Sequence, residues 1–82
     1  MGIGLFIGNL NYETENETLK KHLEKYGEVT ACEIITDKFT FRSKGFAKVE
    51  TPDESEAERI IAGAEGIILD GRPLRIERFR DS

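Results

Sequence analysis

The chain alternates short apolar runs with longer stretches of helical periodicity. The run Leu5-Phe6-Ile7-Gly8 is followed by the polar Asn9, a pattern typical of a strand that ends there. Later segments are β-branched or alternate in polarity, and the turn Asp70-Gly71 leads into the last of them. We predict four strands, at residues 5–8, 29–36, 45–50 and 73–77.

A first helix is predicted after the first strand, where Leu19, Leu23 and Tyr26 lie at helical spacing. The preceding sequence Thr14-Glu15-Asn16-Glu17 has the form of a capping box, in which the threonine hydroxyl satisfies an amide of the first turn. We expect Gly27 to end this helix in the left-handed conformation.

A second helix is predicted between the third and fourth strands. It begins with another capping box, Thr51-Pro52-Asp53-Glu54, with the proline at the first helical position. Gly63 or Gly66 is expected to end it. Its apolar face consists of Ala57, Ile60, Ile61 and Ala64.

The predicted elements follow the order strand, helix, strand, strand, helix, strand. This is the ferredoxin-like split βαβ arrangement. We therefore predict an α+β fold in which a four-stranded antiparallel sheet carries both helices on one face. The other face is left open, and its residues are the candidates for function. The sequence has no repeat, linker or low-complexity tract, so residues 1–82 are expected to form one domain.

The composition restricts the class of protein. Cys32 is the only cysteine, so no intramolecular disulfide forms and a metal site is not expected. One cysteine also fits a reducing compartment. The first residues lack the pattern of a signal peptide, and no stretch approaches the ~20 apolar residues that span a bilayer. We expect a soluble, cytoplasmic monomer with no cofactor and no membrane partner.

The net charge of −4 by itself argues against a nucleic-acid partner, but the charges are unevenly distributed. Residues 37–48 and 72–80 each carry four basic side chains against one acidic side chain, whereas residues 50–59 carry five acidic against one basic. The two basic segments either bind an anionic partner or are solvated surface. Their basic residues are Lys38, Arg42, Lys44, Lys48, Arg72, Arg75, Arg78 and Arg80.

Two segments of the chain resemble the RNA recognition motif family. Residues 5–10, Leu-Phe-Ile-Gly-Asn-Leu, match the hexapeptide motif of that family. Residues 44–51, Lys-Gly-Phe-Ala-Lys-Val-Glu-Thr, resemble its octapeptide, which reads basic, Gly, aromatic, Gly or Ala, aromatic, aliphatic, any, aromatic. Residues 34–38 and 42–46 also resemble its small, single-domain, bacterial-type members. The resemblance extends from Leu5 to Phe79.

The resemblance implies binding of single-stranded RNA, or single-stranded DNA, on the open face of the sheet. Phe6 would stack under one base, at about 1–3 kcal/mol per base, and Phe46 would pack against ribose rings. Lys44, at the first octapeptide position, would contact a phosphate. Gly8 and Gly45 would let a nucleotide approach the backbone, although either is equally consistent with a plain strand-edge glycine.

The sequence departs from the family pattern at two octapeptide positions. Lys48 occupies the fifth position, which is normally an aromatic residue that stacks a base, and Thr51 occupies the eighth, which is usually a buried aromatic. Without that platform, binding should be weaker by about 1–3 kcal/mol and more electrostatic. Lys48 can still contact a phosphate or a base edge.

Strand alternation places further residues on the open face, namely Ile35, Arg75, Glu77 and Phe79. Glu33 and Glu77 would put negative charge under the nucleotide, which favours weak or selective binding. The predicted RNA-binding residues are Phe6, Gly8, Arg42, Lys44, Phe46, Lys48, Arg75, Glu77 and Phe79.

The loop between the second and third strands contains Phe39 and Phe41, where the family often has a Thr-Gly turn. We expect the two phenylalanines to fold back onto the domain. The alternative is that they contact RNA or a protein partner.

Other candidate residues have structural explanations. His22 has no partner at metal-binding or catalytic spacing and is expected on the surface of the first helix. Cys32 and Tyr26 are expected in the core, and Tyr12 is expected to pack locally.

Two other functions share the predicted topology. A protein-interaction domain with little or no RNA affinity would tolerate the acidic balance and Lys48. Peptide-binding family members carry an Arg-x-Phe signature before the last strand, whereas this chain has Arg72-Pro73-Leu74. Acylphosphatases also have this topology, but the sequence shows no Gly-rich phosphate cradle near the first strand and no acid–base or nucleophile constellation. We therefore expect no enzymatic activity.

Overall fold

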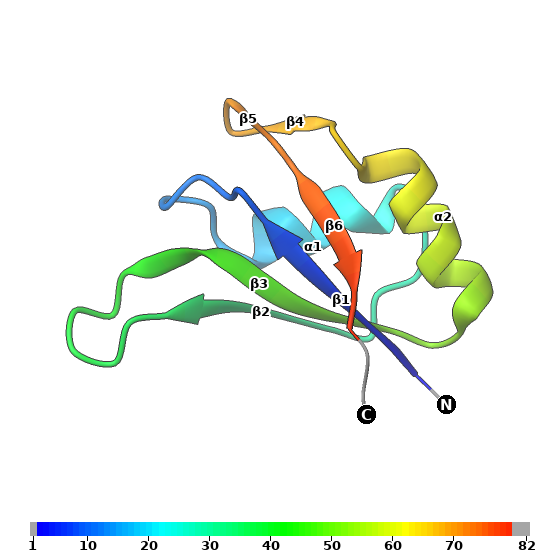
Figure 1. Ribbon diagram of the computed structural model, residues 1–82, viewed down its shortest axis with the longest axis horizontal. Coiled ribbons are helices and arrows are strands. Elements are labelled where there is room, and N and C mark those ends of the chain that lie inside the picture. Colours follow the sequence, from blue (N-terminus) through cyan, green and yellow to red (C-terminus); the bar gives the residue numbers. More distant parts are fainter. Residues whose placement is uncertain (1, 80–82) are drawn as a thin grey trace.

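The computed structural model describes residues 2–79, which form two helices, a four-stranded sheet and a small separate hairpin (Figure 1). Arg80, which contributes to one of the basic segments, lies outside the described residues. The elements in chain order are β1 (Ile3–Gly8), α1 (Asn16–Glu24), β2 (Ala31–Thr36), β3 (Ser43–Thr51), α2 (Glu54–Ala64), β4 (Ile68–Leu69), β5 (Arg72–Pro73) and β6 (Arg75–Arg78).

The main sheet is antiparallel and has the strand order β2-β3-β1-β6. The predicted ferredoxin-like βαββαβ fold is thereby confirmed. The predicted last strand is divided: its first residue, Pro73, pairs with β4 in the hairpin β4–β5, and only β6 joins the main sheet. Asp70 and Gly71 both have positive φ, 51° and 84°, as a tight hairpin turn requires.

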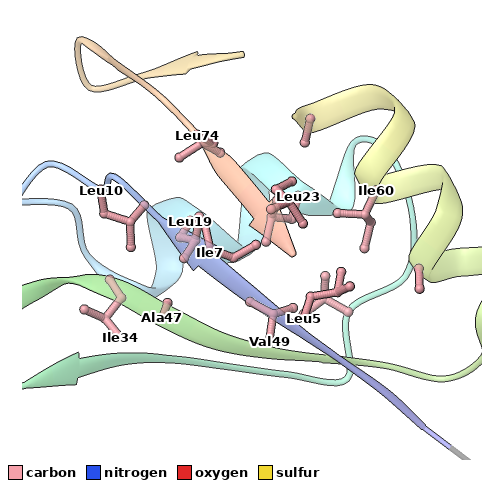
Figure 2. Close-up of a cluster of buried hydrophobic side chains, with 14 residues drawn as sticks. Leu5, Ile7, Leu10, Leu19, Leu23, Ile34, Ala47, Val49, Ile60 and Leu74 are labelled. Carbon is pink, nitrogen blue, oxygen red and sulfur yellow. The ribbon is translucent and has the colours of Figure 1, made fainter. Parts of the chain in front are cut away.

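The core lies between one face of the main sheet and the two helices (Figure 2). β1 contributes Leu5 and Ile7, which are fully buried, and α1 contributes Leu19 and Leu23 at the predicted spacing. Apolar burial of this kind is the main force that favours folding. The remaining members of the core are Leu10, Val29, Ile34, Ala47, Val49, Ala57, Ile60, Ala64, Leu74 and Ile76.

Both predicted capping boxes are wrong, because their threonines bond elsewhere. The Thr14 hydroxyl donates to the Asp70 carboxylate at 2.7 Å, and α1 begins after Glu15 without a side-chain cap. The buried Thr51 hydroxyl donates to the carbonyl of Ile3 at 2.9 Å, which ties β3 to β1. The cap of α2 is instead Asp53, whose carboxylate accepts from the amide of Glu56 at 3.0 Å. Pro52 therefore precedes the cap.

Gly27 does not end α1 in the left-handed conformation, because its φ is not positive. Its role is a close approach of the segment after α1 to α2: a Cβ at position 27 would lie 2.8 Å from the Glu56 carbonyl oxygen and 3.0 Å from the Ile60 side chain. Gly63 within α2 similarly leaves room for the Tyr26 ring, which packs against the core as predicted. Gly66, with a φ of 79°, follows the end of α2.

We predict that Gly27→Ala lowers the free energy of unfolding by about 1–3 kcal/mol, because the added methyl group must push α2 away. Gly27→Asn should lower the free energy of unfolding more than Gly27→Ala does, because its larger side chain meets the same α2 backbone. Urea unfolding followed by circular dichroism measures both. Asparagine tolerates the left-handed region, so an asparagine variant more stable than the alanine variant would contradict the close-approach explanation.

Candidate nucleic-acid interface

The open face of the main sheet, opposite the helices, carries a row of side chains that crosses all four strands. The register places Phe6 of β1 opposite Lys48 of β3 and Glu77 of β6, and places Glu33 of β2 opposite Lys48. Directly opposed residues of antiparallel strands project from the same face. We call Glu33, Lys48, Phe6 and Glu77 the central row.

Three phenylalanines form a cluster centred on Phe6. The ring centroids of Phe6 and Phe46 are 5.3 Å apart with the planes tilted by 32°, and those of Phe6 and Phe79 are 6.1 Å apart in an edge-to-face arrangement. Phe6 and Phe46 are half-buried by these contacts, and Phe79 is 40 % exposed. This aromatic cluster lies on the face that no helix covers, so its remaining surface is available to a ligand.

Two glycines of β1 leave room for these rings. A Cβ on Gly8 would lie 3.3 Å from the Phe6 ring, and a Cβ on Gly4 would lie 3.2 Å from the Cβ of Phe79. Phe79 is further fixed by its amide, which donates to the Gly4 carbonyl at 2.8 Å. The predicted site residue Gly8 therefore shapes the face by admitting the Phe6 ring.

Lys48 has an aromatic partner that the sequence did not indicate. Its Nζ lies 5.4 Å from the centroid of the Phe79 ring, within the range of a cation–π interaction. The aromatic group missing from the fifth octapeptide position is thus supplied next to Lys48 by the residue after β6. The interaction is worth about 0.5–1 kcal/mol at an exposed site, so a phosphate can displace the ammonium group.

The predicted basic residues lie at several places around the aromatic cluster. Arg75 is exposed on β6 opposite Gly8. Lys44 and Arg72 line a shallow hollow of about 290 Å³. Phe6, Phe46 and Tyr12 also line it. Arg42 lies in the β2–β3 loop and lines a neighbouring hollow.

Arg78 differs from the other arginines of its segment. It is paired with Leu5 on the helix side of the sheet and forms ion pairs with Glu54 and Glu58 of α2. Its charge is therefore used to hold α2 against the sheet edge. The basic segment at residues 72–80 thus contributes Arg72 and Arg75, and not Arg78, to the neighbourhood of the open face.

The open face also carries negative charge, as the sequence indicated. Glu33 and Glu77 are exposed, and neither takes part in an ion pair with another residue of the described range 2–79. Both flank the Lys48–Phe6 pair in the central row. An unpaired carboxylate beside a stacking ring repels phosphate and accepts hydrogen bonds from base amino groups.

Phe39 and Phe41 do not fold back onto the domain, so that expectation is wrong. Their exposed fractions are 90 % and 80 %. Hydrogen bonds within the β2–β3 loop, and not apolar contacts, determine its conformation.

Tyr12, in the loop after β1, is 66 % exposed and approaches Gly45, whose φ is 84°. Any other residue at position 45 would strain the backbone, and its Cβ would lie 2.9 Å from the Cε1 atom of the Tyr12 ring.

His22 lies on α1 and is half-buried, less exposed than expected. Its ring packs edge-to-face on that of Tyr26, with the ring centroids 5.8 Å apart, and its Nε2 is buried without a hydrogen-bond partner within residues 2–79. Burial, and secondarily the charge of Lys25, lower the pKa of His22. Cys32 is half-buried against the core, as expected, and burial raises the pKa of its thiol.

Two further types of feature are absent from the described part of the chain. Residues 2–79 contain no group of three or more His, Cys, Asp or Glu side chains that could hold a metal ion. Neither helix in this range has the length and apolar composition needed to span a membrane.

Comparison with known proteins identifies the family. The family model of the RNA recognition motif matches residues 5–75, which include all of β3 and most of β1. The chain therefore belongs to the RNA recognition motif family.

Individual relatives agree with this assignment. The chain is 41 % identical over 76 residues to serine/arginine-rich splicing factor 2 of Gallus gallus, an alignment that covers 93 % of this chain and 34 % of that protein. It is 42 % identical over 72 residues to the chloroplastic RNA-binding protein CP29B of Arabidopsis thaliana, covering 88 % of this chain and 25 % of that protein. The chain thus spans about a third or less of the length of these curated relatives.

Solved structures show the same fold at near full coverage. The crystal structure of RNA-binding protein PG1 has a TM-score of 0.89 and 38 % identity, covering 98 % of this chain and 96 % of that one. The first two RRM domains of the yeast poly(U)-binding protein Pub1 give a TM-score of 0.91 and 28 % identity, with 98 % of this chain and 48 % of that one covered.

Proposed function

We propose that this chain binds single-stranded RNA on the open face of its sheet. The observation that carries the proposal is the aromatic cluster of Phe46, Phe6 and Phe79, which lies on the face without helices and is flanked by Lys48 and Arg75. Flat rings beside cations are what an unstacked, phosphate-linked base requires. Membership of the RNA recognition motif family and the RNA-binding names of relatives such as CP29B support it.

In this proposal the side chains have distinct roles. Phe6, at the centre of the cluster, stacks one base, and Phe46 contacts the adjacent ribose. Lys44 and Arg75 contact phosphates by charge-assisted hydrogen bonds. Glu77, opposite Phe6, accepts a hydrogen bond from the edge of the stacked base, which favours bases that present amino groups.

Lys48 has a dual role in the same proposal. In the free protein its ammonium group lies over the Phe79 ring. When RNA binds, a phosphate attracts the ammonium group, and the Phe79 ring becomes available to a second base. Binding then combines stacking with a phosphate contact at the position where the family normally has an aromatic residue alone.

The direct test of the proposal is Phe6→Leu, which keeps apolar bulk but removes the flat ring. We expect RNA affinity to fall roughly five- to 150-fold, which corresponds to the loss of about 1–3 kcal/mol of stacking. The free energy of unfolding should change by less than about 1.5 kcal/mol, because Phe6 is outside the core. Fluorescence anisotropy with a short random-sequence RNA pool and urea unfolding give the two quantities.

The matched control for Phe6→Leu is Ile68→Ala. Ile68 is 60 % exposed on the β4–β5 hairpin and takes no part in the aromatic cluster. The Ile68→Ala substitution should therefore leave RNA affinity unchanged. Equal affinity of the Phe6→Leu variant and the original chain, or an equal loss in both variants, would contradict binding on the open face.

A second prediction separates the two contributions of position 48. Lys48→Met removes the charge but keeps the length, so it should weaken binding at low salt and reduce the slope of log affinity against log salt by about 0.7. Lys48→Phe removes the same charge and adds a ring. It should bind roughly five- to 150-fold more tightly than Lys48→Met at every salt concentration.

Anisotropy titrations of both variants at several salt concentrations make this comparison. A salt slope that Lys48→Met leaves unchanged would exclude the phosphate contact. Equal affinities of Lys48→Met and Lys48→Phe would exclude base stacking at this position.

A further inference from the structure

The strand β6 lies at an edge of the main sheet. Its residues pair with β1 on one side, and no strand of the described range 2–79 pairs with its other side. Arg75 and Glu77 of this strand lie on the open face, and Phe79 follows directly after its last residue. An edge strand has unpaired backbone groups along its free side. Contacts on that side therefore influence where the open-face residues of β6 lie.

Helix α2 and its C-cap residue contact β6 through three carboxylates, and Figure 1 shows the helix beside this strand. Near the start of β6, the amide of Ile76 donates to the Glu65 carboxylate. At the end of β6, the Arg78 guanidinium forms ion pairs with Glu54 and Glu58. The two glutamates are about one helical turn apart, so both reach the same arginine. The helix thereby holds β6 along its free side.

The ion pairs of Arg78 lie one residue away from the aromatic cluster. Arg78 is opposite Leu5 on the helix side of the sheet, whereas the next residue, Phe79, lies on the open face. The Phe79 ring centroid is 6.1 Å from that of Phe6 and 5.4 Å from the Nζ of Lys48. A displacement of the Arg78 backbone therefore moves the Phe79 ring relative to both partners.

Phe79 lies beyond the last residue of β6, where support from the sheet decreases. Its side chain is 40 % exposed, and its amide donates to the Gly4 carbonyl at 2.8 Å. The ring also lines a hollow of about 180 Å³, which Lys48 and Glu50 line as well. The shape of this part of the open face therefore depends on where the ring lies, and the contacts of Arg78 add to its support.

We propose that Glu54, Glu58 and Arg78 are positioning residues for RNA binding. Their ion pairs on the covered side of the sheet hold the Phe79 ring in its place on the open face. This inference rests on the proposed RNA-binding function and deepens it, because the affinity of the open face then depends on carboxylates on the opposite side of the sheet. Exposed ion pairs contribute little to folding stability, so their loss leaves the fold intact.

The test is the double substitution Glu54→Gln/Glu58→Gln, for which two explanations predict opposite signs. If the two carboxylates act only through the net charge, their removal reduces the repulsion of RNA and raises the affinity. If they position Phe79, their removal should lower the affinity roughly two- to fivefold, the upper range for exposed ion pairs. Fluorescence anisotropy with a short random-sequence RNA pool measures the affinity.

The matched control is Glu17→Gln/Glu24→Gln, which removes two carboxylates from α1. This helix covers the same face of the sheet, both side chains are exposed, and within residues 2–79 Arg78 pairs with neither of them. The control variant should bind RNA at least as tightly as the original chain. If Glu54→Gln/Glu58→Gln binds RNA as tightly as the control variant, or more tightly, the proposal is overturned.

A double-mutant cycle tests whether the carboxylates act through Phe79. Phe79→Leu removes the flat ring and keeps apolar bulk. In the Phe79→Leu background, Glu54→Gln/Glu58→Gln should cause no further loss of RNA affinity. A loss of the same size with and without the Phe79 ring would mean that α2 acts on RNA binding by another route, which also overturns the proposal.

A measurement without RNA tests the positioning by itself. Because the Lys48 ammonium group lies over the Phe79 ring, the ring current shifts the NMR signals of the Lys48 ε-methylene protons upfield. Glu54→Gln/Glu58→Gln should reduce this shift, and the control variant should preserve it. An unchanged Lys48 shift in Glu54→Gln/Glu58→Gln would refute the positioning role.

The failure of the positioning role and the failure of the proposed function are distinguishable. If RNA binds in a Phe6-dependent manner while the α2 substitutions leave both the affinity and the Lys48 shift unchanged, only the positioning role is refuted. If no RNA binds the original chain, the proposed function fails, and the Lys48 shift alone decides whether the α2 carboxylates position Phe79.

Discussion

Two helices cover only one face of the four-stranded sheet. This one-sided coverage determines which side chains each strand must direct to the core and which to the open face. Side chains alternate between the faces, so β1 gives Leu5 and Ile7 to the core and Phe6 to the open face. A shift of the register by one residue would exchange these sets and expose the core. The burial of Leu5 and Ile7 therefore fixes the position of Phe6, and with it the position of Lys48 opposite.

The same division between the faces explains how an acidic chain can present a surface suited to RNA. The acidic helix α2 lies on the covered side, where Glu54 and Glu58 pair with Arg78. The open face carries Lys48 and Arg75 around the aromatic cluster, together with the Glu33 and Glu77 carboxylates of the central row, which form no ion pair within residues 2–79. A ligand approaching the open face meets this local arrangement, and the net charge of the whole chain is a poor guide to it.

The sequence predicted the fold and the principal open-face residues, because hydrophobic periodicity and strand alternation are local properties. It failed where local patterns compete with distant partners. Thr14 and Thr51 match capping boxes, yet their hydroxyls bond Asp70 and Ile3, which are remote in sequence. The contact between Lys48 and Phe79 likewise depends on the order of strands across the sheet.

The measurement that tests the central claim most directly is an amide-shift titration of the chain with a short, single-stranded RNA pool. If RNA lies on the open face, the perturbed amides should belong to β1, β3 and β6, which carry the aromatic cluster and its cations, while α2 remains unaffected. Shifts that cluster on α2, or no shifts at millimolar RNA, would contradict the account.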